Sequence, residues 1–186
     1  MPLKRLLVVA LAVALLVTVA GCGAKSAAQA PRPASRAVYL TPVAGGSITA
    51  SDLAAHPEVV VVHDQAGLRS STTTGSAIWI DKAAVDSASG PWLKHASFEG
   101  HPIAVIGVGS ALYAFWDLLG FGGSRPQGSV TAKDRARPGF AVWMVIGETA
   151  TSMSATHEAT TTAPTVNRVL RVCDEIRPGS KPRPSP

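Results

Sequence analysis

The chain has 186 residues, of which 46% are hydrophobic and 16% are charged. This composition is too apolar for a disordered protein, and the length allows one domain with a hydrophobic core but not two large domains. The formal net charge of +5 comes from the two ends of the chain. Residues 37–176 contain nine of the 17 Lys and Arg but all 12 Asp and Glu, so their net charge is about −3. This charge argues against a nucleic-acid-binding face on the folded part.

The first 22 residues have the three parts of a secretory signal peptide and its cleavage site. Lys4 and Arg5 precede an uncharged, apolar run over residues 6–20, which is short for a membrane span of about 20 residues. The segment ends in Val19-Ala20-Gly21-Cys22, which resembles the lipobox of bacterial lipoproteins. The resemblance implies cleavage before Cys22, a diacylglyceryl group on its sulfur and an acylated new N-terminus. Several acyl chains hold a protein stably on a membrane.

The lipobox resemblance implies a lipid-anchored protein on the extracytoplasmic face of a cell membrane. An uncleaved anchor helix with an incidental cysteine is the alternative. Gly23, in place of Asp, follows Cys22, so the sequence shows no inner-membrane retention signal.

The sequence divides into four parts. After the signal peptide (1–21), residues 22–36 are small, polar or Pro and predict a flexible tether. Residues 177–186 contain four prolines and no larger apolar side chain, which predicts a disordered tail. A single domain over residues 37–176 remains.

Four apolar runs in this domain predict strands, at residues 59–62, 77–80, 103–106 and 140–146. They are continuous rather than alternating, which is typical of strands covered on both faces, as in a parallel sheet. We therefore expect an α/β three-layer sandwich with a mostly parallel sheet of about four strands. Residues 65–76 leave room for one antiparallel or hairpin element, because they have poor helix propensity and are short for a crossover.

Helices are predicted between the strands. Residues 110–119 have an apolar stripe, with Ser110 as a candidate N-cap and Gly120 just past the end. Residues 164–176 have a second stripe that includes Cys173. Since Cys22 is lipidated in this interpretation, Cys173 has no disulfide partner and is expected to be a small buried hydrophobe. Shorter helices are predicted after Thr49 and on either side of Gly90-Pro91.

Polar residues follow each predicted strand, where ligands bind in open parallel sheets. The candidate ligand-binding residues are Asp64, Asp81, Gly107, Gly109, Ser110 and Glu148, of which Asp64, Ser110 and Glu148 are also catalytic candidates. Asp81 and Ser110 are equally well explained as N-caps. Capping explains Asp64 and Glu148 less well, because Ser/Thr-rich segments follow them.

Known catalytic motifs are incomplete in this chain. Leu112 stands at the third glycine position of G-x-G-x-x-G after Gly107, and Ser110 lacks the glycines of a nucleophile elbow. His63 is expected to bond to backbone at a strand end. The other histidines have no metal-ligand spacing, and residues 150–165 predict a surface loop. We therefore expect no metal and no cofactor.

The sequence favours a binding or envelope-associated module over an enzyme. Its expected partners are the membrane, through the lipid on Cys22, and either a small ligand or an envelope protein; nucleic acid is not expected. An extracytoplasmic hydrolase that uses the strand-end carboxylates with Ser110 is one alternative. A protein-interaction module is the other.

Overall fold

The structure is a computed structural model that describes residues 36–121, 130–136, 138–145, 153–159 and 164–177. These residues belong to one compact unit of the chain, Pro33–Pro186. The predicted signal peptide, Cys22, nearly all of the tether and the tail from residue 178 lie outside the described residues.

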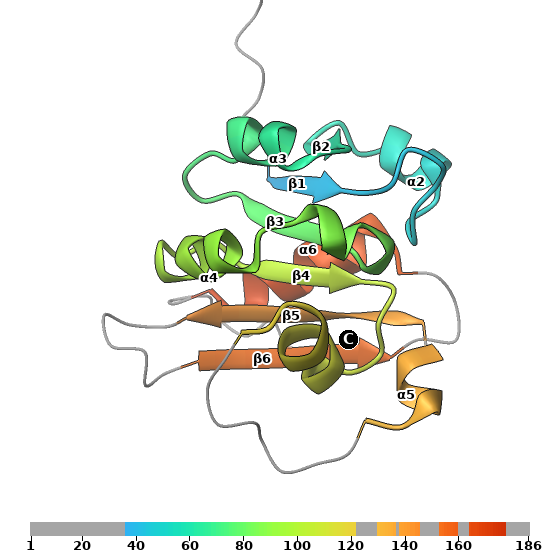
Figure 1. Ribbon diagram of the computed structural model, residues 1–186. Coiled ribbons are helices and arrows are strands. Elements are labelled where there is room, and N and C mark those ends of the chain that lie inside the picture. The colour runs from blue at the N-terminus through green and yellow to red at the C-terminus, as the bar shows by residue number, and fades with distance from the viewer. Residues whose placement is uncertain (1–35, 122–129, 137, 146–152, 160–163, 178–186) are drawn as a thin grey trace, which may run out of the picture. The chain divides into compact units, whose positions relative to one another are not determined.

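The described strands form one sheet of six strands in the order β2-β1-β3-β4-β5-β6 (Figure 1). The first four strands along the chain are parallel to one another, whereas β5 is antiparallel to β4 and β6 is antiparallel to β5. The strands are Ala37–Leu40 (β1), Val59–Val62 (β2), Ala77–Asp81 (β3), Ile103–Ile106 (β4), Gly139–Val145 (β5) and Met153–Ala159 (β6).

Helices connect most of these strands. They are Ala50–Ala54 (α2), Gln65–Ser71 (α3), the 3₁₀ helix Lys82–Ser87 (η1), Gly90–Phe98 (α4), the π-helix Tyr113–Leu118 (η2), Ala132–Ala136 (α5) and Val166–Glu175 (α6).

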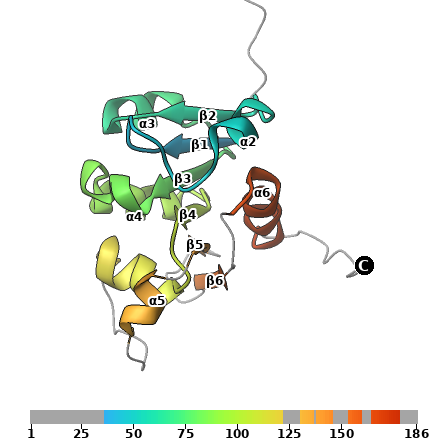
Figure 2. The same cartoon turned by 90° about the vertical axis from the view of Figure 1, so that its right-hand side faces the viewer.

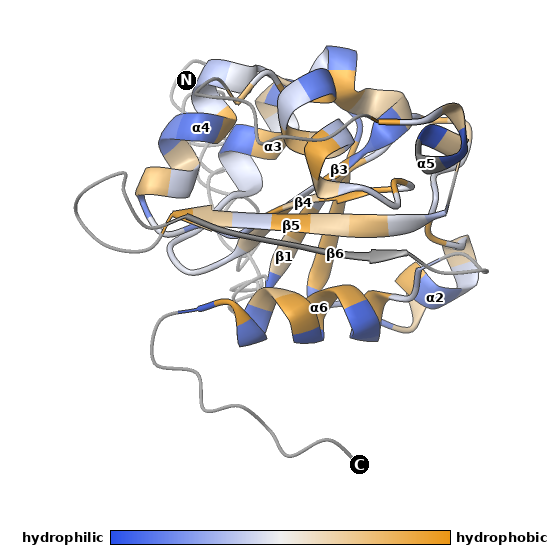
Figure 3. Ribbon diagram, turned by 90° about the horizontal axis from the view of Figure 1, so that it is seen from below, coloured by the Kyte–Doolittle hydropathy of each residue, from blue (hydrophilic) through white to orange (hydrophobic). Residues whose placement is uncertain are grey.

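Helices cover both faces of the sheet, which gives three layers (Figure 2). Successive side chains of a strand point to opposite faces. Val38 and Leu40 of β1 therefore pack in one core with α3, α4 and η2, while Ala37 and Tyr39 pack in a second core with α6. Figure 3 shows the apolar side of α6 turned toward the sheet and its polar side turned away.

The predicted α/β fold class and mostly parallel sheet are confirmed. The four apolar runs form β2, β3, β4 and β5, and the antiparallel element is β5 with β6. The sheet has six described strands rather than about four, because β1 and β6 were not predicted. Residues 65–71 form α3 instead of a loop or hairpin, and the predicted surface loop at residues 150–165 contains β6.

The predicted helix starts are partly confirmed. Ser110 Oγ accepts a hydrogen bond from Tyr113 N at 3.3 Å, but the helix that follows is wound as a π-helix over residues 113–118. At the start of α6 the side chain of Thr165 makes no cap bond. Asp52 of α2 caps α6 instead, because Asp52 Oδ2 accepts a hydrogen bond from Val166 N at 2.7 Å. This bond joins two helices on the same face of the sheet.

The buried thiol of Cys173 predicts a loss of stability at alkaline pH. Cys173 is 1% exposed in the core beneath α6, and burial raises the pKa of its thiol from 9.0 to about 12. Between pH 9 and about 12 the folded state keeps the thiol proton, whereas the unfolded chain has lost it. The contribution of the Cys173 thiol to the free energy of unfolding is therefore present below pH 9 and is lost as pH rises toward 12. In urea titrations we expect Cys173→Ala to flatten this decline. Parallel curves for the two chains would contradict the assignment.

Candidate functional site

The sheet has a topological switch point between β1 and β3. From β1 the chain passes by α2 to β2 on one side, and from β3 it passes by α4 to β4 on the other. Because α2 and α4 pack in different cores, the two connections leave on opposite faces. In open α/β sheets the carboxyl ends of strands at such a point form the ligand crevice.

Asp81, at the end of β3, is the central polar group at this edge. It is 1% exposed, and its Oδ2 accepts hydrogen bonds from Tyr39 Oη and Ser47 N, both at 2.6 Å. Its Oδ1 accepts from Ala83 N at 2.9 Å and caps η1. Capping is therefore confirmed, but it is only part of the role. Asp81 also ties the loop that follows β1 to the end of β3.

Tyr39 and Thr41 lie at the carboxyl end of β1. Burial, followed by the bond to Asp81 and its charge, raises the pKa of the Tyr39 phenol well above its usual range. Thr41 is 5% exposed, and its Oγ1 makes no well-formed hydrogen bond with another described residue, although it lies beside the Tyr39 phenol and lowers the Tyr39 pKa against the larger effects of burial and Asp81. A buried hydroxyl without a well-formed hydrogen bond is uncommon.

Two glycines let the backbone approach these polar groups closely. A Cβ on Gly46 would overlap Thr41 Oγ1 and lie 2.7 Å from Tyr39 Oη. Gly107, which follows β4, has φ +89°, and a Cβ there would overlap Ser47 Oγ and lie 3.2 Å from Lys82 Cδ. The ends of β1, β3 and β4 thus converge.

The predicted candidates after β3 and β4 lie around this point. Gly107 and Gly109 are buried, Ser110 is half-buried with its Oγ facing Tyr113 N, and Asp81 sits between the strands. They form the site with five residues that the sequence analysis did not select: Tyr39, Thr41, Gly46, Ser47 and Lys82.

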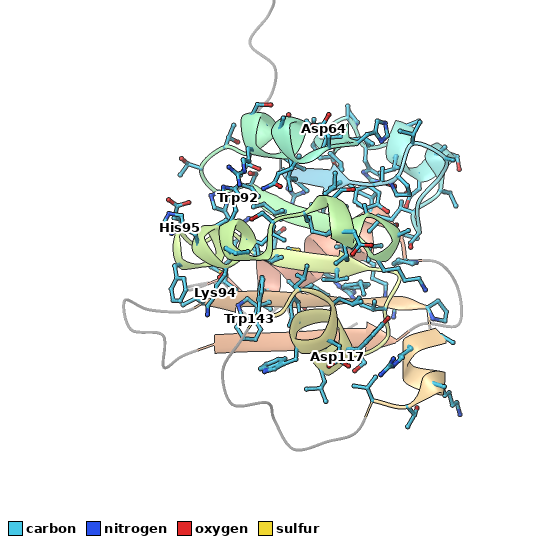
Figure 4. All side chains as sticks on the ribbon, viewed as in Figure 1. Asp64, Trp92, Lys94, His95, Asp117 and Trp143 are labelled. Carbon is cyan, nitrogen blue, oxygen red and sulfur yellow. The ribbon has the colours of Figure 1, made fainter. Side chains whose placement is uncertain are left out.

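Asp64 has a structural explanation that the sequence analysis underestimated. Its Oδ1 accepts from Gly67 N at 2.7 Å and caps α3, a helix that was not expected there. Asp64 follows β2, three strand spacings or about 14 Å from β4, so it does not meet Ser110. Figure 4 shows Asp64 beside α3 and β2 at one side of the sheet and Asp117 of η2 toward the other. His63 Nδ1 lies 2.9 Å from Thr41 O, the backbone partner expected of it.

Glu148 lies outside the described residues, but the strand before it runs the other way. In the register of β4 and β5, Ile106 pairs with Phe140 and Ile103 with Trp143, so β5 ends at the edge where β4 begins. Four strand ends were interpreted as parts of the ligand-binding edge of a parallel sheet, and for β5 this interpretation was wrong. Of the residues proposed for a hydrolase, Asp64 and Ser110 follow strands that are three positions apart in the sheet and are not brought together.

The described residues contain no group of three His, Cys, Asp or Glu side chains placed to hold a metal ion. Within the same residues, no helix has the length and apolar character needed to cross a bilayer.

In comparisons with known proteins, no family model, no curated protein and no solved structure matches this chain.

Proposed function

We propose that this chain is an envelope lipoprotein, anchored through lipid on Cys22, whose α/β domain binds a small polar ligand at the β1/β3 edge. The signal peptide and the lipobox-like Val19-Ala20-Gly21-Cys22 support the anchor. The buried hydroxyl of Thr41, which makes no well-formed hydrogen bond with another described residue, supports the ligand site, since such a hydroxyl is free to bond to a ligand that arrives.

The loop over Thr41 is held mainly at its ends. Thr41 N donates to Val62 O at 3.1 Å, and Ser47 N donates to Asp81. Between them, residues 42–46 are half-buried or exposed, and Val43 is 83% exposed. Because Gly46 covers Thr41 Oγ1, a ligand reaches this hydroxyl when the loop lifts. When the loop lifts, Asp81 keeps its hydrogen bonds to Tyr39 and Ala83, which lie outside the loop.

The ligand site is tested by NMR on the chain from Gly23 to Pro186, which retains both cores because these lie within residues 37–176. The probes are inorganic phosphate, acetate, glycine and glucose, which span anionic, zwitterionic and neutral ligands. We expect at least one of them to shift the amides of residues 41, 43–47 and 107–110. Shifts confined to other surfaces, or none with any probe, would contradict the proposed site.

The anchor is tested separately by Cys22→Ala. We expect this variant to leave the membrane fraction or to remain as an unprocessed precursor, and to lose incorporation of labelled fatty acid. Cys173→Ala is the matched control, because Cys173 is buried and should leave processing and labelling unchanged. Unchanged fractionation, size and labelling of Cys22→Ala would contradict the anchor.

A further inference from the structure

The carboxylate of Asp81 is already in use within the fold. Its Oδ2 accepts hydrogen bonds from Tyr39 Oη and Ser47 N, and its Oδ1 accepts from Ala83 N. Because Asp81 is 1% exposed, a positively charged ligand would have to displace these donors to reach the carboxylate. Other side chains at this edge are therefore left to bind a ligand.

Two polar side chains meet at Gly107, where β4 ends. A Cβ on Gly107 would overlap Ser47 Oγ and lie 3.2 Å from Lys82 Cδ, so the two side chains flank the same point. Lys82 is exposed and Ser47 is half-buried. Among the described residues, neither the Lys82 ammonium nor the Ser47 hydroxyl has a hydrogen-bond or ion-pair partner. Both groups are thus available to a ligand.

The charges at this edge are matched unequally. The negative charge of Asp81 is met by three hydrogen-bond donors, whereas the positive charge of Lys82 is met by no acceptor among the described residues. An ammonium group donates hydrogen bonds and accepts none, and hydroxyl groups can donate as well. A group that brings acceptor oxygens and a negative charge therefore fits this point best.

We propose that the ligand of this site is a small anion, bound through a phosphate or carboxylate group by the Lys82 ammonium and the hydroxyls of Ser47 and Thr41. This inference rests on the proposed ligand site and adds the class of ligand. Lys82 and Ser47 make the first contacts, and Thr41 joins them when residues 42–46 lift. Hydrogen bonds between charged groups are about twice as strong as neutral ones, so Lys82 supplies most of the selectivity against neutral ligands.

Probes of equal shape and different charge test the class of ligand. Acetate and acetamide are similar in size, but only acetate is charged; inorganic phosphate is a second anion and glucose a second neutral probe. In NMR titrations of the chain from Gly23 to Pro186 at low ionic strength, we expect phosphate, acetate or both to shift the amides of residues 43–47, 82 and 107–110. Acetamide and glucose should leave these amides unchanged. A response to only one of the two anions identifies the group that is bound.

Lys82→Gln tests the role of the ammonium. Lys82 is exposed and Gln keeps part of its aliphatic stem, so we expect the variant to fold, which its amide spectrum checks. The dissociation constant of the bound anion should rise on the order of tenfold or more. Lys94→Gln is the matched control, because it removes the same charge from an exposed position on α4 and should bind like the parent chain.

Two sets of results would overturn the proposal in distinguishable ways. If acetamide or glucose binds at these amides as tightly as the anions, or if Lys82→Gln binds the anion no more weakly than Lys94→Gln does, the assignment of an anion held by Lys82 is wrong while the ligand site stands. If none of the four probes shifts these amides, the ligand site itself is contradicted, and the anion with it.

Discussion

Asp81→Ala is expected to lower the free energy of unfolding by about 3 kcal/mol, or Tm by about 10 °C. The substitution removes the acceptor of three hydrogen bonds, including the one that the buried phenol of Tyr39 donates. It also frees the loop after β1 from the end of β3. Thermal and urea unfolding of the chain from Gly23 to Pro186 measure the loss.

Asp64→Ala is the matched control for this prediction. Asp64 also follows a strand and caps the next helix, but it is exposed and accepts one backbone bond, from Gly67 N. Loss of such a cap costs about 1 kcal/mol. Equal losses in the two variants would show that Asp81 acts only as a helix cap.

Gly107→Ala is expected to lower the free energy of unfolding by about 2–4 kcal/mol. Two effects add. The φ of +89° disfavours any residue with a Cβ, and the new methyl group would overlap Ser47 Oγ. In the ligand-free structure the bond from Ser47 N to Asp81 holds Ser47 in place against Gly107.

Gly100→Ala separates the two effects. Gly100 has φ +85°, close to that of Gly107, but a Cβ there would meet nothing within 4 Å. We expect it to cost only the conformational part, about 1–2 kcal/mol. A loss equal to that of Gly107→Ala in denaturant titrations would mean that the carboxyl edge has room for a side chain, contrary to the close approach described above.

The central strands were predictable because their sequence pattern and their environment agree. Residues 77–80 and 103–106 are unbroken apolar runs, and all eight are buried between two helical layers. β1 is an apolar run as long as β2 and β4, but it was missed because it directly follows the polar, Pro-containing segment interpreted as a tether. α3 was missed because Gly67 and Ser/Thr residues lower its helix propensity; the Asp64 cap and the burial of Leu68 offset this.

The candidate site was only partly predictable, and the main reason is that strand β1 was not predicted. Without β1, nothing in the sequence places the loop from Thr41 to Ser47 beside Asp81, so the bond from Ser47 N and the burial of the Thr41 hydroxyl were not expected. Strand direction was the second obstacle. The apolar run of β5 is as continuous as that of β4, although β5 is antiparallel, and continuity reports burial on both faces rather than direction.

The most direct test of the proposed site is the melting temperature of Thr41→Val without ligand. If the Thr41 hydroxyl is buried without a partner, its removal relieves about 1 kcal/mol or more and raises Tm by about 3 °C or more. Thr49→Val is the matched control and should lower Tm, because Thr49 Oγ1 accepts from Asp52 N at 3.3 Å and caps α2. If Thr41→Val instead lowers Tm, as Thr49→Val should, the Thr41 hydroxyl already has a partner within the chain. That result would contradict the proposed ligand site.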